Sequence, residues 1–340
     1  MRHHVSVGTT IGLGLAIGLG AAATTGCTIW AALSEREQNK AMIEARFTDS
    51  RSLKHDGIER TYKVHVPPQY DKKTPMAMVM VFHGGFGSAD AAEMQSQMTV
   101  TADKMGFISV YPEGLGRPMA PAMARSWNGG TCCDPAMSRK VDDVGFISDL
   151  IDDMAKAYKI DRRRVYATGL SNGAIMSYRL GCDLADKIAA IAPIDGPNAT
   201  DTCKPSKPVS LLHFHGTADP CSPYQGGPGG GCAARALGLP AKPIFDTPSI
   251  PDIVADWAKK IGAPEKARQT FQEAAVTCMT YGPGRDGAEA TLCSLDGYGH
   301  TWPGGVDKLP ESLVGKVNHD ISANEMMWEF FQKHARKSGA

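Results

Sequence analysis

Short apolar runs alternate with longer amphipathic stretches along most of the chain. The run at 76–82 is continuously apolar, as expected for a strand that is buried on both faces of a sheet. The stretch 143–158 instead repeats its apolar residues at helical spacing. These patterns predict strands at 60–66, 76–82, 107–111, 164–168, 189–192 and 209–214, and helices at 90–104, 143–158, 251–261 and 324–334, with a further helix ending near 185.

Strands that alternate with helices favour the α/β class, with a mostly parallel, doubly wound sheet covered by helices on both faces. A hairpin is expected between residues 278 and 293, around a central turn-forming stretch. The glycine-rich stretch 226–231 follows no phosphate-binding pattern and is interpreted as a flexible rim loop. We expect a tether at 28–56 and one folded domain at 57–340.

The first 27 residues have the pattern of an export signal peptide. A short basic start precedes an apolar, glycine-rich stretch that ends at Gly26. Cys27 follows directly, as at a bacterial lipoprotein cleavage site, although Thr24 stands where leucine is usual. Lipidation of Cys27 is the preferred interpretation, while ordinary cleavage nearby and an uncleaved anchor stay open. The protein is therefore expected to be periplasmic, held in the cell envelope by lipid, or extracellular.

The charge balance argues against one large class of partners. The chain has 36 Lys and Arg against 36 Asp and Glu, so no net field attracts nucleic acid or an anionic membrane surface. No nucleic-acid partner is expected, and membrane attachment would come only through a lipid on the N-terminal segment. The oligomeric state does not follow from the sequence.

The nine cysteines fit an oxidising compartment. An even number remains for disulfides if Cys27 carries lipid. The three predicted pairs are Cys278–Cys293 across the hairpin, Cys221–Cys232 around the glycine-rich loop, and Cys182–Cys203 between a helix end and a later loop. Either the adjacent Cys132 and Cys133 then bond to each other, or one of these local pairings is wrong; unpaired buried thiols are the remaining alternative.

The stretch 169–174, with the letters GLSNGA, has the form of a turn that presents a nucleophilic serine. It follows a predicted strand and precedes a predicted helix, which is the context that a G-x-S-x-G motif requires. Gly169 and Gly173 fit this turn because a Cβ atom would crowd the backbone on either side of Ser171. Ser171 is therefore the candidate nucleophile.

A serine nucleophile needs a base and an acid, which follow it in the order Asp, then His, in α/β-hydrolases. His300 lies in a glycine-rich loop after a strand and is the preferred base, whereas His319 and His334 are attributed to the surface. Asp219 comes directly after the strand that starts near 209, and it is preferred as the acid over Asp252 and Asp256, which fall in a predicted helix. His213 and His215 share one strand face, but no third ligand joins them, so structural hydrogen bonds are favoured over a metal site.

Further residues are candidates for oxyanion and substrate contacts. The loop at 83–87 and the turn after Ser171 are expected to stabilise an oxyanion through the backbone amides of Gly85, Phe86 and Asn172. The substrate-binding candidates are Trp302, carried by the loop of His300, Trp127, and Tyr224 in the loop after Asp219.

These residues together resemble the exported polyhydroxybutyrate depolymerase and feruloyl esterase family of α/β-hydrolases. The serine turn and the stretch 299–304 carry most of the resemblance. The supporting segments are 83–85, 127–128 with Cys132 and Cys133, 142–147, 164–166 and 215–219.

The resemblance implies a catalytic domain that hydrolyses esters with Ser171, Asp219 and His300, and that uses neither a metal nor an organic cofactor. The stretch 220–251 is longer than the family pattern leads us to expect, and it could reshape the substrate pocket beside Asp219. The choice between feruloyl and polyhydroxyalkanoate esters therefore stays open. Hydrolysis of β-diketones in oxidised poly(vinyl alcohol) is an alternative, as is a noncatalytic surface binding protein on a hydrolase scaffold.

Overall fold

The computed structural model describes residues 46–117, 124–200, 202–230, 245–306 and 309–337, together with Met42, Met119 and Cys232. The chain divides after Ala45, and the unit that starts at Arg46 carries the fold described below. The predicted signal peptide, Cys27 and most of the predicted tether lie outside the described residues.

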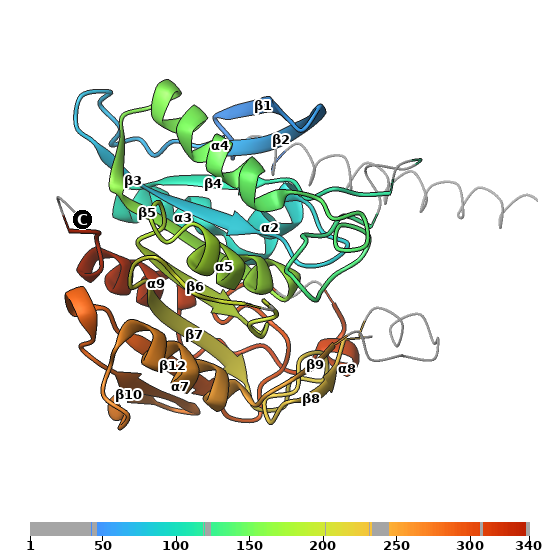
Figure 1. Cartoon of the computed structure of the whole chain (residues 1–340), viewed down its shortest axis with the longest axis vertical. Coiled ribbons are helices and arrows are strands. Elements are labelled where there is room, and N and C mark those ends of the chain that lie inside the picture. The colour runs from blue at the N-terminus through green and yellow to red at the C-terminus, as the bar shows by residue number, and fades with distance from the viewer. Residues whose placement is uncertain are drawn as a thin grey trace, which may run out of the picture. The chain divides into compact units, whose positions relative to one another are not determined.

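The strands form one large sheet and a small two-stranded sheet. They are β1 (Asp49–His55), β2 (Ile58–His65), β3 (Met76–Phe82), β4 (Ile108–Pro112), β5 (Ile160–Leu170), β6 (Ala190–Ile194), β7 (Ser210–Gly216), β8 (Gly227–Gly229), β9 (Phe245–Thr247), β10 (Arg268–Glu273), β11 (Val276–Tyr281) and β12 (Ala290–Leu295). The ten-stranded sheet has the order β1-β2-β4-β3-β5-β6-β7-β12-β11-β10, and β8 pairs with β9 (Figure 1). Pairing is parallel from β4 through to β12 and antiparallel towards both edges.

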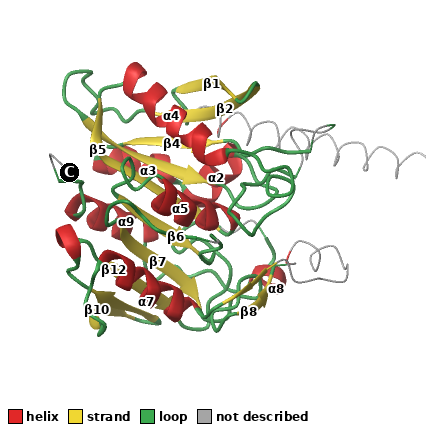
Figure 2. Cartoon of the chain, in the orientation of Figure 1, coloured by secondary structure: helices red, strands yellow, loops and turns green. Residues whose placement is uncertain are grey.

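Helices cover the two faces of the large sheet (Figure 2). They are α2 (Ala89–Ser96), α3 (Met98–Met105), α4 (Asp143–Ala157), α5 (Asn172–Asp183), α7 (Ile250–Ile261), α8 (Glu311–Val314) and α9 (Ala323–Lys333), with a 3-10 turn, η1, at Arg285–Gly287. Successive residues of β3 separate the two layers: Met78, Met80 and Phe82 pack in the core with α4, α5 and α7, and the residues between them pack with α2, α3 and α9. This alternation makes β3 a strand buried on both faces, as its continuous apolar run predicts. The α/β class and the mostly parallel sheet are confirmed.

The structure corrects two predicted boundaries and adds one strand. The sheet begins at Asp49 rather than near Gly57, because β1 pairs with β2 along its whole length and so takes in the end of the predicted tether. The predicted helix at 90–104 is two helices, since Gln97 between α2 and α3 has a left-handed backbone (φ 50°). The charged strand β10 extends the hairpin of β11 and β12; its polar sequence hides it from a hydrophobicity pattern.

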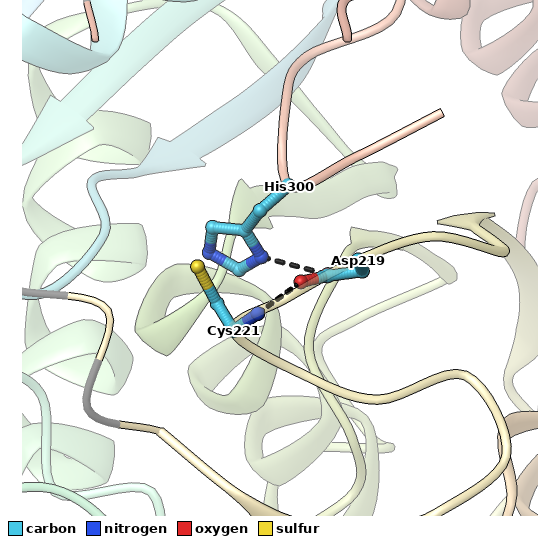
Figure 3. Close-up of side chains that lie close together, drawn as sticks. All are labelled: Asp219, Cys221 and His300. Atoms are coloured by element: carbon cyan, nitrogen blue, oxygen red, sulfur yellow. Dashed lines mark hydrogen bonds and ion pairs between the residues drawn. The ribbon is translucent and has the colours of Figure 1, made fainter. Parts of the chain in front are cut away.

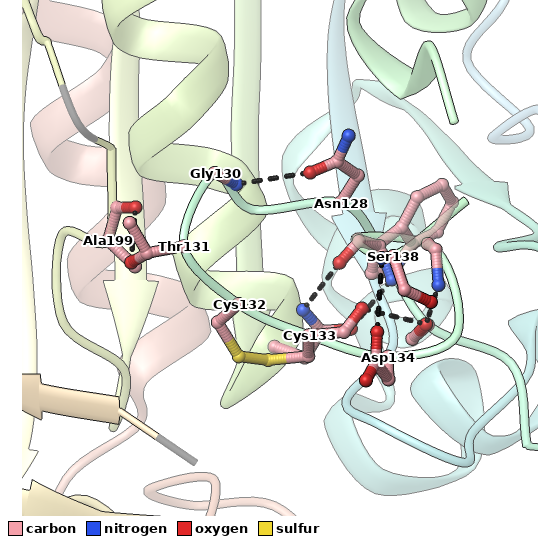
Figure 4. The surroundings of a disulfide bond; sticks show 12 residues. Asn128, Gly130, Thr131, Cys132, Cys133, Asp134, Ser138 and Ala199 are labelled. Atoms are coloured by element: carbon pink, nitrogen blue, oxygen red, sulfur yellow. Dashed lines mark hydrogen bonds between the residues drawn. A yellow bond between two sulfur atoms is a disulfide. The ribbon is translucent and has the colours of Figure 1, made fainter. Parts of the chain in front are cut away.

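Four disulfides link the eight cysteines beyond Cys27. The three predicted pairs are present, and Cys278 lies directly opposite Cys293 in the register of β11 and β12. Cys132 bonds to Cys133, so the first of the two alternatives for these adjacent residues is confirmed (Figure 4). Four disulfides indicate an exported protein. Within the described part of the chain, no helix is both long enough and apolar enough to cross a membrane.

Candidate active site

Ser171 stands at the sharp turn between β5 and α5. Its backbone has φ 60° and ψ −119°, a conformation that non-glycine residues adopt mainly at functional sites. A Cβ atom added to Gly169 would lie 2.8 Å from the carbonyl carbon of Gly173, so both flanking glycines are required by space. The Ser171 amide donates to the carbonyl of Ile194 at the end of β6 (2.9 Å).

The loop after β3 lies against this turn. A Cβ atom at Gly84 would be 3.5 Å from Cβ of Ser171, and one at Gly85 would be 4.0 Å from Cβ of Asn172. The amide of Asn172 has no acceptor within the helix because Asn172 is the first residue of α5. Among the described residues no acceptor is found for the amide of Gly85. Two unengaged N–H groups therefore lie beside Ser171.

The side chain of His83 holds the loop of Gly84 and Gly85 through two hydrogen bonds. Its Nδ1 donates to the carbonyl of Gly84 (2.7 Å), while its Nε2 accepts from the amide of Gly114 (3.0 Å). Because the C=O and N–H of one peptide point in opposite directions, holding the Gly84 carbonyl directs the Gly85 amide to the other side. Burial lowers the pKa of His83 to about 4, which keeps the imidazole neutral and able to accept.

Phe86 differs from its predicted role. Its amide donates to the carbonyl of Arg125 (2.7 Å), so this group is not available to an oxyanion and the prediction for it is wrong. Phe86 has a left-handed backbone (φ 64°), and its side chain is largely exposed. A bulky residue in this conformation is an outlier that points to function.

Trp127 is fully buried, so its predicted place as a substrate contact is wrong. Its indole N–H donates to the carbonyl of His83 (3.0 Å), and its ring packs edge-on against Phe82. The side chain of Asn172 accepts from the Trp127 amide (2.7 Å) and donates to the Trp127 carbonyl (3.0 Å). Trp127 therefore supports the loop and the serine turn from within the protein.

The other two aromatic candidates also face the interior. Trp302 is buried among residues of α9, and its indole N–H donates to Asn324 (2.8 Å), so its predicted substrate contact is wrong as well. Tyr224 is partly exposed, but its hydroxyl bonds to Ser294 (2.6 Å) and its ring packs edge-on against His215. Its polar end is therefore not offered to a substrate.

Asp219 and His300 lie together at the ends of neighbouring strands (Figure 3). Nδ1 of His300 donates to Oδ2 of Asp219 (2.8 Å), and both side chains are buried. Oδ1 of Asp219 accepts from the amides of Cys221 (2.6 Å) and Ser222 (2.9 Å). Burial alone would raise the pKa of Asp219, but His300 and His215 lower it well below its usual range, so Asp219 is ionised. This leaves Nε2 of His300 as the ring nitrogen that can exchange a proton.

Asp195 links the serine turn to the histidine loop. It follows Ile194, which accepts the Ser171 amide, and its Oδ2 accepts the amide of Thr301 (2.9 Å), next to His300. Its Oδ1 accepts the amide of Gly216 (2.9 Å), at the end of the strand that leads to Asp219. One buried carboxylate thus ties together the segments that carry all three triad candidates. No motif singled out Asp195 in the sequence, although its position three residues after a predicted strand could have drawn attention to it.

The described residues contain two buried groups of potential metal ligands near this site, Asp219 with Cys221 and His300, and Asp195 with His215 and Asp219. In the first group Cys221 is oxidised in a disulfide, so it offers no thiolate, and Nδ1 of His300 already donates to Asp219. In the second group the carboxylate oxygens accept backbone amides and His215 bonds on both ring nitrogens. His213 and His215 thus make the structural hydrogen bonds predicted for them.

Comparisons with known proteins find relatives that are esterases. Residues 60–198 match the family model described as Esterase PHB depolymerase. "Putative esterase NocK" of Nocardia uniformis subsp. tsuyamanensis is 28% identical over 298 residues, which are 83% of this chain and 82% of that protein. "Feruloyl esterase B" of Piromyces equi is 32% identical over 239 residues, or 68% of this chain, but the match spans only 40% of that protein.

Among solved structures, the acetyl xylan esterase from Aspergillus awamori has the same fold. The TM-score is 0.54 at 14% identity, and the match covers 84% of this chain and 99% of that one. Residues 60–198 therefore match the Esterase PHB depolymerase family, and the relatives and the fold indicate a carboxylic ester hydrolase of the α/β-hydrolase fold.

Proposed function

We propose that this protein is an exported serine esterase that hydrolyses carboxylic esters through an acyl-enzyme on Ser171. The observation that carries the proposal is the hydrogen bond of His300 to the ionised Asp219, at strand ends that Asp195 ties to the serine turn. A serine hydroxyl on a strained turn, an imidazole with one free nitrogen and a buried carboxylate are the parts that acyl transfer needs.

In the proposed mechanism, Oγ of Ser171 attacks the ester carbonyl while Nε2 of His300 takes the hydroxyl proton. Asp219 holds the Nδ1–H and stabilises the imidazolium that forms. The amides of Gly85 and Asn172 donate to the oxyanion of the tetrahedral intermediate. His300 then protonates the leaving alcohol, and a water molecule activated by His300 releases the acid from Ser171.

We favour feruloyl-type esters over polyhydroxyalkanoates as the substrate. Phe86 is 67% exposed and lies two residues after Gly84, where an added Cβ atom would be 3.5 Å from Cβ of Ser171. An exposed ring held in a strained backbone conformation suits stacking on an aromatic acyl group. The relative named Feruloyl esterase B agrees with this choice.

The first test replaces the nucleophile. Ser171→Ala should lower kcat/KM for p-nitrophenyl acetate by at least about 10³-fold, because removing a triad member usually costs several orders of magnitude. Ser177→Ala is the matched control in the same helix: it loses one buried hydrogen bond, to Gly173 (2.9 Å), and should keep its activity. Full activity of correctly folded Ser171→Ala would contradict the mechanism.

The second test separates substrates. The wild-type protein should hydrolyse methyl ferulate faster than hydroxybutyrate oligomers, and Phe86→Ala should raise KM for methyl ferulate while leaving p-nitrophenyl acetate nearly unchanged. Faster cleavage of the oligomers, or of a β-diketone, would overturn the substrate choice without touching the nucleophile.

We also propose that export ends in lipidation of Cys27. The four disulfides support export, and the Gly26-Cys27 pair supports lipidation. Cells fed radiolabelled palmitate should label the wild-type protein but not Cys27→Ser. Equal labelling of both, or no label on either, would contradict it.

A further inference from the structure

A group of buried polar side chains lies behind Asp219 and takes no part in the mechanism above. Tyr178 comes from α5, His213 and His215 from β7, and Asp195 from the end of β6. Tyr178, His213 and His215 are fully buried and Asp195 nearly so. Titratable groups taken out of water are costly unless they are fully hydrogen-bonded, so their arrangement calls for an explanation.

These side chains form one continuous chain of hydrogen bonds. The hydroxyl of Tyr178 bonds to Nδ1 of His213 (2.8 Å), and Nε2 of His213 bonds to Nδ1 of His215 (2.9 Å). Nε2 of His215 donates to the carbonyl of Ser222 (2.8 Å) and lies 3.4 Å from Oδ2 of Asp219. That oxygen is the one that accepts from His300. Asp219 therefore stands between two imidazoles, His300 on the active-site side and His215 behind it.

The charged and titratable groups around His215 come from several elements. Asp195 reaches within 4.0 Å of Nδ1 of His215, and Asp219 lies on its other side. The Tyr224 ring packs edge-on against it, and His213 stacks on it from the same strand. Burial raises the pKa of Asp195 to about 8, so the charge that a proton on His215 would offset in this site closed to water is mainly that of Asp219.

We propose that Tyr178, His213 and His215 form a positioning chain for Asp219, in which proton uptake by His215 sets how strongly Asp219 supports His300. The proposal rests on the esterase mechanism proposed above and deepens it. His215 touches neither substrate nor nucleophile; it acts through Asp219.

The hydrogen bonds between Tyr178, His213 and His215 can be completed with the protons in either of two arrangements. With His215 neutral, Tyr178 donates to His213, His213 donates to His215, and His215 donates to the Ser222 carbonyl. With His215 protonated, both its ring nitrogens donate, so His213 donates from Nδ1 to Tyr178 instead. The environment favours the second arrangement: burial alone would lower the pKa of His215, but Asp219 and Asp195 raise it above its usual value. Burial and the charge of His215 hold the pKa of His213 well below its usual value, as a neutral link requires.

The consequence for His300 has a definite sign. A positive charge behind Asp219 offsets part of the carboxylate's attraction for the His300 imidazolium, so the imidazolium is stabilised less strongly. Loss of that charge strengthens the attraction. Because the acidic limb of kcat/KM reports the base of the free enzyme, it should move to higher pH when His215 can no longer be protonated.

The decisive variants are His215→Gln and Tyr178→Phe. His215→Gln keeps a donor but cannot carry charge, and we expect its acidic limb to rise by about 0.5–1 pH unit. Tyr178→Phe removes the acceptor that His213 needs when His215 is protonated, so its limb should rise by a smaller amount. Tyr166→Phe is the matched control, because Tyr166 is a fully buried tyrosine whose hydroxyl donates to a backbone carbonyl, that of Phe331 (2.7 Å), away from the site. Its limb should not move.

Nitrogen NMR of the histidine rings tests the chain without turnover. In the wild-type protein, His215 should carry protons on both ring nitrogens at pH 6, and it should lose its second ring proton at a lower pH in Tyr178→Phe than in Tyr166→Phe. A neutral His215 from pH 5 to 9, or limbs that coincide in folded His215→Gln and the wild type, would overturn the proposal. If the protein proved inactive on esters, the NMR result would still show whether His215 takes up a proton. Failure of this proposal can therefore be distinguished from failure of the esterase mechanism.

Discussion

The two sides of the active site are held in different ways. On the serine side, the contacts around the turn and the loop of Gly85 are neutral: an imidazole that accepts an amide, an indole N–H on a carbonyl, and a carboxamide on the backbone of Trp127. On the acid–base side, the buried carboxylate of Asp219 lies between two imidazoles, and the buried carboxyl group of Asp195 fixes the loop of His300. Geometry on the first side depends on sterics and neutral hydrogen bonds, and on the second side on charge.

The two sides also differ in how they match the family model. The family model matches residues 60–198 and so includes the serine side, but it ends before Asp219 and His300. The acid–base side instead follows from topology, because β7 and β12 are parallel neighbours and therefore place the loops of Asp219 and His300 at the same sheet edge. Changes on this side should affect catalysis most strongly.

The largest effect is expected for Asp219→Asn. The amide cannot stabilise the His300 imidazolium and favours the wrong tautomer, so kcat/KM should fall by about 10³–10⁴-fold. Steady-state hydrolysis of p-nitrophenyl acetate measures this. Asp256→Asn removes an exposed acid that pairs with Lys260 (2.8 Å) and should stay within about two-fold of wild type. A loss in Asp256→Asn with activity retained in Asp219→Asn would assign the acid to the rival position.

Next in size is the disulfide beside the acid. Cys221 is joined to Cys232, donates its amide to Asp219, and has its sulfur within 4.8 Å of a ring nitrogen of His300. Replacing both Cys221 and Cys232 by alanine should free this turn and lower kcat by about ten- to a hundred-fold, the scale of a small misplacement.

The Cys278–Cys293 pair is the matched control for that experiment. It joins β11 to β12 in the sheet, so its double alanine variant should lose about 2–4 kcal/mol of stability and keep kcat. Equal kcat losses in the two double variants would show that the Cys221 turn has no special role.

The neutral imidazole of His83, on the serine side, should make the free energy of unfolding depend on pH. The pKa of His83 falls to about 4 in the folded protein, so between about pH 6.5 and 4 the unfolded chain binds a proton that the folded chain excludes. Stability therefore falls as the pH falls, by about 2 kcal/mol between pH 7 and 5 for this residue. Urea unfolding at the two pH values should give a smaller difference for His83→Gln than for the wild type. An unchanged difference would mean that His83 is protonated in the folded protein.

The smallest catalytic effect is expected for Trp302→Phe. The change leaves Oδ1 of Asn324 without its donor, which should cost about 1–2 kcal/mol of stability. KM for methyl ferulate should stay within about two-fold, because the indole is buried. A large rise in KM with unchanged stability would show that Trp302 does contact the substrate.

The features that could be predicted from the sequence are those that residues close together in the chain determine. The turn at Ser171, the buried run of β3 and the Cys278–Cys293 pair each follow from residues close together in the chain, and so could be read locally. The burial of Trp127 and Trp302 and the engagement of the Phe86 amide by Arg125 depend on packing between distant segments, which no periodicity reports. Asp195 was missed for the same reason, since its partners Gly216 and Thr301 are remote in sequence.

The central claim is that Ser171 is the activated nucleophile, and covalent labelling tests it most directly. Folded wild-type protein is treated with a fluorophosphonate, digested and analysed by mass spectrometry. The account predicts one phosphonylated residue, Ser171, with labelling abolished in Ser171→Ala and strongly slowed in Asp219→Asn. A folded wild-type protein that takes no label, or takes it on another residue, would contradict the account.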